Sequence, residues 1–184
     1  MATSGQTIND RLNAVRYALV GQGLARTVCK ASTEEVLGPK RKHIECKYKA
    51  RNERSHSLKN LEETSNLAFY HLMHITDLIA CTNEPNVSIP QLANLLIERT
   101  QHSSWAVVFK SLISLHHLMS YGNDRFTQYL ATSNHSFELA DFMDRTTPQG
   151  YNMSTFVRRY AKYINEKSIS YRTLAVDVCK VRSW

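Results

Sequence analysis

The sequence contains little glycine or proline, with 6 Gly and 4 Pro among 184 residues. Globular proteins usually contain about 12 % of the two together, so this low content excludes collagen-like and low-complexity chains. Hydrophobic residues make up 42 % and charged residues 21 %, which excludes a chain that is disordered throughout. No uncharged apolar run reaches the ~18 residues of a membrane-spanning helix. We therefore expect an ordinary folded protein of one to one-and-a-half domains.

Signals for export, lipidation and disulfide formation are also missing. The first sixteen residues lack the apolar core of a signal peptide, and the last four are not a prenylation box. The four cysteines stand 17, 35 and 98 residues apart and form no CxxC pair. We expect a cytosolic protein with reduced thiols.

Sequence motifs of common enzymes are absent, including the P-loop, GxGxxG, GxSxG and HExxH. His71 and His74, together with Cys46 and Cys81, could be imagined as zinc ligands, but their spacing matches no zinc module. His116 and His117 are adjacent, so on a helix they point apart and cannot form a pair. We expect packed or solvated histidines, no catalytic residues, no metal and no cofactor.

Apolar residues recur at helical spacing along most of the chain, and strand-like alternation is nowhere sustained. One such stripe, which we interpret as core, consists of Trp105, Val108, Phe109, Leu112, Leu115 and Met119. Antiparallel helix pairs joined by short loops indicate an all-α bundle or solenoid. The expected helices cover residues 8–19, 24–30, 57–81, 88–100, 105–121, 125–131, 137–143, 154–165 and 167–181, with a loop at 147–150.

The first expected helix is amphipathic. Ile8, Leu12, Val15 and Leu19 fall on one face, which is too short to span a bilayer. This face could lie in a membrane interface or pack on the rest of the protein, and the pattern does not choose between the two.

Positive charge is concentrated in the first third of the chain. Residues 1–60 hold 12 basic and 5 acidic residues, whereas residues 61–122 hold 2 and 5. Gly38-Pro39 precedes a basic run where a helix is expected to begin, because Pro is tolerated at the first helical position. A helix start offers free N–H groups and the positive end of the dipole, so Lys40, Lys42 and His43 there would suit a phosphate group. A solvated charge run is the alternative interpretation.

Long stretches of this sequence resemble the ANTH domain of the phosphatidylinositol-binding clathrin assembly proteins, the CALM-type endocytic adaptors. The resemblance covers roughly 150 residues. The matching stretches are SGQTINDRL, VCKAS-TEEVLGPKRKH, CTNEPNVSIPQLANLLIERT, SSWAVVFKSLISLHHLMSYGNDRFTQYLA and GYNMSTFVRRYAKYINEKSISYR.

This resemblance implies a right-handed α-helical solenoid, an ENTH/ANTH-like and VHS-like superhelix. It implies binding of phosphatidylinositol 4,5-bisphosphate through Lys30, Lys40, Lys42 and His43. It further implies a membrane-insertion helix over Ile8–Leu19, clathrin and coat adaptors as partners, and a place at the inner plasma membrane, in clathrin-coated pits and vesicles.

Two departures from the family pattern stand out. About 31 residues, Cys46 to Thr76, intervene between the K-K-H of the family and the helix that ends in C-T-N-E. They are either a lineage-specific insertion or a gene-model error, and we expect 46–56 to be a mobile loop and 57–76 to extend the following helix. The second departure is the end of the chain, because the later solenoid helices and the clathrin-binding tail of the family are not in this sequence. SNARE binding, which the family places on those helices, and direct clathrin binding, which it places in the tail, are therefore both in doubt for this sequence.

Three functions remain open on the sequence. The first is a phosphoinositide-binding adaptor module formed by a partial ANTH domain over residues 1–184. The second is a protein-interaction scaffold that lost lipid binding through the insertion. The third is a basic protein that binds nucleic acid, which the near absence of aromatics in the basic region disfavours.

Overall fold

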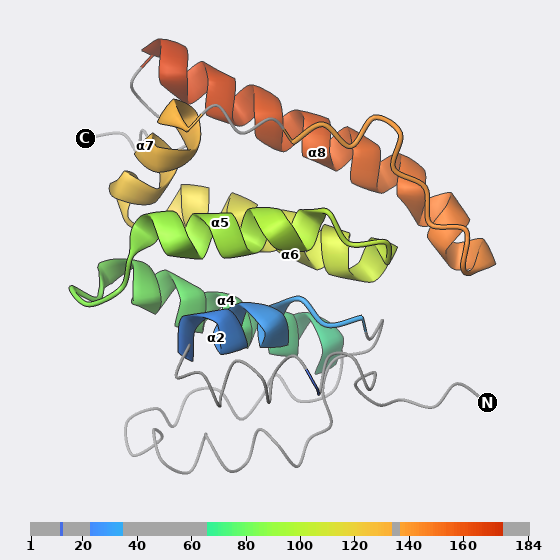
Figure 1. Cartoon of the computed structure of the whole chain (residues 1–184), viewed down its shortest axis with the longest axis horizontal. Coiled ribbons are helices and arrows are strands. Elements are labelled where there is room, and N and C mark those ends of the chain that lie inside the picture. Colours follow the sequence, from blue (N-terminus) through green and yellow to red (C-terminus); the bar gives the residue numbers. More distant parts are fainter. Residues whose placement is uncertain (1–11, 13–22, 35–65, 134–136, 175–184) are drawn as a thin grey trace.

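The computed structural model describes residue 12, residues 23–34, residues 66–133 and residues 137–174. All regular secondary structure in these segments is helical, as the sequence predicts. Figure 1 shows the arrangement of these helices. They are α2 (Gly23–Ala31), α4 (Asn66–Asn83), α5 (Ile89–Thr100), α6 (Trp105–Tyr121), α7 (Asp124–Thr132) and α8 (Pro148–Leu174).

The helices are stacked in successive tiers (Figure 1). α2 and α4 form one tier, α5 and α6 the next, and α7 and α8 the last, with contacts within and between neighbouring tiers. Short connections join α4 to α5, α5 to α6 and α6 to α7, which is the pattern of helix pairs in an α-helical solenoid.

Local side chains set several helix ends where the sequence predicts them. The Ser88 hydroxyl accepts a hydrogen bond from the Gln91 N–H, which caps the start of α5. The Asn123 side chain caps α7 in the same way, by accepting from the Arg125 N–H at 3.0 Å. Gly122 caps the end of α6 by donating its N–H to the Leu118 carbonyl at 2.9 Å, and glycine is required there because a Cβ would lie only 2.5 Å from that carbonyl oxygen.

α6 is the central helix of the described solenoid. It contacts α2, α4, α5, α7 and α8, so it is buried on more than the single stripe that the sequence suggests. Ser111 and Ser114 are fully buried, and their hydroxyls donate hydrogen bonds to the carbonyls of Val107 and Lys110 one turn earlier. Small side chains at these positions allow neighbouring helices to approach closely. The main hydrophobic core around α6 includes Leu78, Leu92, Leu96, Leu112, Leu115, Leu118, Phe126, Leu130, Val157 and Ile164.

The prediction of a helix over 137–143 is wrong. This segment has no helical residues, and only isolated turns join Phe137, Leu139 and Phe142. The segment buries Phe137 and Leu139 in the core, and α8 supplies partners for its backbone. Arg158 donates to the Phe142 carbonyl at 2.9 Å, so polar groups from another helix replace the hydrogen bonds that a helix would make.

The expected break between helices at 165–167 and the loop at 147–150 are also wrong. α8 is one continuous helix of 27 residues that already begins at Pro148. The Thr147 hydroxyl accepts from the Gly150 N–H at 2.9 Å, and Pro at the helix start loses no hydrogen bond. No Gly or Pro interrupts the stretch around Glu166, and Ile164 and Ser168 continue the buried face.

The remaining expected helices lie partly or wholly outside the described residues. The helix expected over 57–81 is present as α4 from Asn66 onward, so the prediction that the second half of 46–76 extends this helix is confirmed for Asn66–Thr76. The expected helix at 8–19 is described at Leu12 alone, which is helical, and residues 35–65 and 175–184 are not described.

Candidate functional site at the end of α2

Lys30, the one predicted headgroup residue that the structure describes, lies in the last turn of α2. This helix buries Ala25, Val28, Cys29 and Ala31 against the solenoid, while Lys30 is only half-buried. The end of α2 therefore presents a basic side chain at the border between the core and solvent.

Two long basic side chains from the next tier hold the residues that follow α2. Arg99, at the end of α5, donates from Nε to the Ser32 hydroxyl at 2.8 Å and from a terminal nitrogen to the Ser32 carbonyl. Lys110, on α6, donates from Nζ to both the carbonyl and the hydroxyl of Thr33, each at 3.1 Å. Both acceptors are more than sixty residues away along the chain, so these bonds tie separate tiers together.

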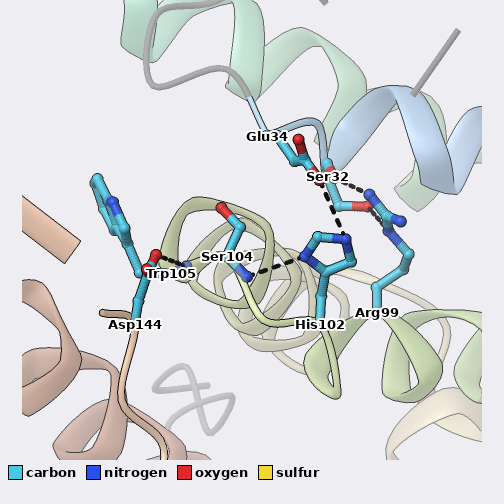
Figure 2. A network of polar contacts seen from close by, with 7 residues as sticks. All are labelled: Ser32, Glu34, Arg99, His102, Ser104, Trp105 and Asp144. Carbon is cyan, nitrogen blue, oxygen red and sulfur yellow. Dashed lines mark hydrogen bonds and ion pairs between the residues drawn. The ribbon is translucent and has the colours of Figure 1, made fainter. Parts of the chain in front are cut away.

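A histidine in the α5–α6 loop holds the next residue. His102 Nε2 lies 3.3 Å from a carboxylate oxygen of Glu34, while its Nδ1 accepts the backbone N–H of Ser104 at 3.1 Å. A neutral imidazole that accepts at Nδ1 carries its proton on Nε2, so the same ring donates to Glu34. Figure 2 shows His102 between Glu34 and Ser104, with Arg99 on Ser32 beside it.

The polar network continues to Asp144, at the far side of the α6 start (Figure 2). One carboxylate oxygen accepts the Trp105 N–H at 2.9 Å, and the other accepts the N–H and hydroxyl of Thr146. The Ser104 side chain makes no capping bond, so Asp144 caps α6 from 39 residues away. A negative charge at a helix N-terminus is also favourable to the helix dipole.

The environment of Asp144 stabilises its carboxylate. Burial by itself would raise the pKa, but the hydrogen bonds from Thr146 and Trp105 favour the charged form. His102 adds a smaller electrostatic contribution in the same direction, and the pKa of Asp144 is lowered. Asp144 is therefore a charged anchor of the fold.

The structure tests only some of the predicted site residues. Lys40, Lys42 and His43 lie outside the described residues, as do Ile8, Val15 and Leu19, so their roles stay predictions. Leu12 is described, and 61 % of its surface is exposed, so this side chain is not part of the buried core.

The described histidines and thiols take part in packing. His116 Nδ1 lies 2.7 Å from the Tyr160 hydroxyl, whereas His117 Nδ1 faces the Ile113 carbonyl on its own helix. Burial raises the pKa of Tyr160 to about 12, with a further contribution from Tyr163, and the pKa of Cys81 is also raised, mainly by burial. Neither group is activated for nucleophilic chemistry at neutral pH. Within the described residues, no group of three His, Cys, Asp or Glu could hold a metal ion.

Among the described helices, none combines the length and apolarity needed to cross a membrane.

Sequence reasoning missed the polar network around the end of α2. One signal was available: Arg99 and Lys110 are the two Lys or Arg residues of 61–122, and Lys110 interrupts the apolar run between Trp105 and Leu115. Such isolated cations usually serve a specific partner. The partners themselves could not be found, because they lie far away in the sequence.

Comparison with known proteins agrees with this architecture. The family model described as the ANTH domain matches residues 71–183. The chain is 52 % identical to the phosphatidylinositol-binding clathrin assembly protein LAP of Drosophila melanogaster, over 99 % of this chain and 35 % of that protein. It is 48 % identical to the human phosphatidylinositol-binding clathrin assembly protein, over 97 % of this chain and 23 % of the relative. It is 45 % identical to the human clathrin coat assembly protein AP180, over 97 % of this chain and 16 % of that protein.

The chain thus spans about a third or less of the length of these curated relatives. Their names describe binding and assembly, and none describes a catalytic activity. A family match over residues 71–183, which include α5, α6, α7 and α8, shows that this chain belongs to the ANTH domain family.

Proposed function

We propose that this chain is the phosphoinositide-binding module of an endocytic adaptor, which recruits the protein to the inner plasma membrane and supports clathrin coat assembly. The observation that carries the proposal is the firmly held end of α2, with Lys30 in its last turn and the most basic part of the sequence following it. The relatives named as phosphatidylinositol-binding align with nearly the whole chain, which supports the same assignment.

The proposed ligand is phosphatidylinositol 4,5-bisphosphate, bound at the surface by Lys30, Lys40, Lys42 and His43. The chain length limits how far these residues can be from one another. Lys40 follows Glu34 by six residues, and an extended chain spans at most ~3.6 Å per residue, so the chain allows a separation of at most about 22 Å between the two. Several cations within that range of α2 would create a positive field, and each contributes about 1 kcal/mol near an anionic membrane.

The N-terminal segment is proposed to add a hydrophobic contact with the bilayer. Ile8, Leu12, Val15 and Leu19 recur at helical spacing, and the exposed Leu12 side chain supports a face that is available to a membrane. An interfacial helix and a basic cluster together would hold a peripheral protein more firmly than either alone.

The proposed partners and location follow the names of the relatives. Clathrin and coat adaptors are proposed as partners of the whole protein, in clathrin-coated pits and vesicles of clathrin-mediated endocytosis. Residues 1–184 are proposed as a partial ANTH domain that carries a family-atypical segment at 46–76. We propose no enzymatic activity and no cofactor for this module.

Liposome co-sedimentation tests the proposed function. The chain should bind vesicles that contain phosphatidylinositol 4,5-bisphosphate better than vesicles with equal charge from phosphatidylserine. Replacing Lys40 and Lys42 together by Glu should weaken binding by more than about tenfold, because it removes two attractions and adds two repulsions. Added salt should weaken binding too, since exposed charges are screened over ~8–10 Å.

A matched control separates the site from net charge. Arg159→Glu with Lys162→Glu changes the charge by the same amount on an exposed part of α8. This control should bind like the parent chain. Equal loss of binding in both double variants would contradict a defined headgroup site. A parent chain that binds no better to vesicles with the phosphoinositide than to vesicles without it would favour the scaffold function.

A further inference from the structure

The stretch 61–122 contains two Lys or Arg residues, and both donate to consecutive residues just after α2. Arg99 donates to Ser32, Lys110 donates to Thr33, and the His102 ring contacts the Glu34 carboxylate. Three basic side chains from α5, α6 and their connecting loop therefore hold three successive residues of a different tier.

We propose that Arg99, His102 and Lys110 form a clamp that positions Lys30 and the end of α2 for phosphoinositide binding. This role rests on the proposed function. The three are positioning residues, since each is committed to protein acceptors: they act on the lipid site through α2.

The need for such a clamp follows from the helix itself. α2 has only nine residues, and a helix of this length is marginal without tertiary support. Its last carbonyls lack partners within the helix, and the Ser32 and Thr33 carbonyls extend that unsatisfied end. Positive side chains at a helix C-terminus both satisfy such acceptors and interact favourably with the dipole.

The clamp residues are well placed to act together. Ser32 and Thr33 are buried, and the Ser32 hydroxyl also donates back to the Val28 carbonyl at 2.8 Å. Donors at both a hydroxyl and a carbonyl fix the orientation of each residue as well as its position. A surface whose basic side chains start from a fixed backbone loses less conformational entropy when it binds a headgroup.

The decisive variant changes no charge. Ser32→Ala with Thr33→Val removes the two hydroxyl acceptors of the clamp and keeps the two carbonyl acceptors, while all lysines, arginines and histidines remain. We expect affinity for vesicles with phosphatidylinositol 4,5-bisphosphate to fall roughly three- to tenfold. The matched control Thr173→Val removes a hydroxyl that bonds a backbone carbonyl near the end of α8 and should leave affinity unchanged.

Three further variants distinguish the clamp from a simple loss of stability. Lys110→Met should lower affinity, and Lys110→Arg should restore it because a guanidinium can again donate to Thr33. Ile164→Val, a core change far from α2 in sequence, should lower the melting temperature without lowering affinity. Hydrogen exchange of the α2 amides should accelerate in Ser32→Ala with Thr33→Val and stay unchanged in Ile164→Val.

The possible results are distinct. Binding by Ser32→Ala with Thr33→Val equal to that of the parent chain overturns the clamp. Loss with Lys110→Met but not with the neutral double variant also overturns it, in favour of direct contact between Lys110 and the lipid. A parent chain that does not bind the vesicles overturns the proposed function and this role with it, and that result is visible before any variant is made.

Discussion

Asp144 and Gly150 are predicted to be energetically coupled, since the fold needs the carboxylate and leaves no space beside it. Asp144 is 2 % exposed and caps α6 through the Trp105 N–H. A Cβ at Gly150 would lie 2.7 Å from Asp144 Cγ and 2.9 Å from an oxygen of that carboxylate. The hydrogen bonds to Trp105 and Thr146 prevent the carboxylate from turning away.

Asp144→Ala should destabilise the fold by about 2–4 kcal/mol. The Trp105 N–H left without its partner costs about 1–3 kcal/mol, and losing the negative charge at the start of α6 costs a further ~0.3–1 kcal/mol. The bonds to Thr146 add less, because Thr146 is exposed and water can replace them. For a chain of this size the melting temperature should fall by roughly 5–15 °C, measured by far-ultraviolet circular dichroism.

Gly150→Ala should also destabilise, by about 1–3 kcal/mol, because forced overpacking outweighs the better helix propensity of Ala. In the Asp144→Ala background the clashing Cγ and oxygen are gone. The Asp144 Cβ, 3.1 Å from the added methyl group, is the tight contact that remains, so Gly150→Ala should then cost much less, and the two changes combined should cost less than their sum. Costs that add within about 0.5 kcal/mol would refute this reasoning.

The pH dependence provides an independent check of the same site. The folded pKa of Asp144 lies below its value of ~3.9 in the unfolded chain, so the carboxylate contributes stability above that pH. This contribution is lost as the pH falls through the folded pKa. The stability difference between the parent and Asp144→Asn should therefore be constant above about pH 5 and shrink in more acidic solution, as followed by urea unfolding.

Three further predictions concern other parts of the chain. The phenol of Tyr160 should titrate near pH 12, and an ultraviolet titration should show the loss of this step in Tyr160→Phe. In the parent chain, stability should fall between about pH 10 and 12, because the phenol ionises at lower pH in the unfolded chain than in the folded one. Leu12→Glu should weaken liposome binding and deformation with unchanged melting, whereas a large drop in melting temperature would contradict the exposed position of Leu12. Deleting 46–76 should preserve or raise stability and preserve lipid binding. Loop length changes the free energy of folding by only ~0.6 kcal/mol per doubling, and after the deletion Ile44 would take the helical position of the buried Ile75. A deletion variant that cannot fold would show that the segment is essential.

The sequence alone determined which segments become helices wherever local signals agreed. α5 and α7 carry their own capping residues, Ser88 and Asn123, and α6 ends at a glycine that its own last turn requires. These interactions join residues only a few positions apart, so they can be read from spacing. The long family motifs likewise identified the ANTH domain without any knowledge of the structure.

Tertiary structure decided the features in which distant residues satisfy one another. The spacing of segment 137–143 predicts a helix, yet the segment is irregular: it buries Phe137 and Leu139 in the core, and α8 supplies Arg158 to the Phe142 carbonyl and Ser154 to the N–H of the following Asp144. Lys110 stands within an apolar run of the sequence, and its partner is Thr33, 77 residues earlier. Hydrogen bonds across tiers depend on which surfaces meet in space, and helical periodicity carries no record of them.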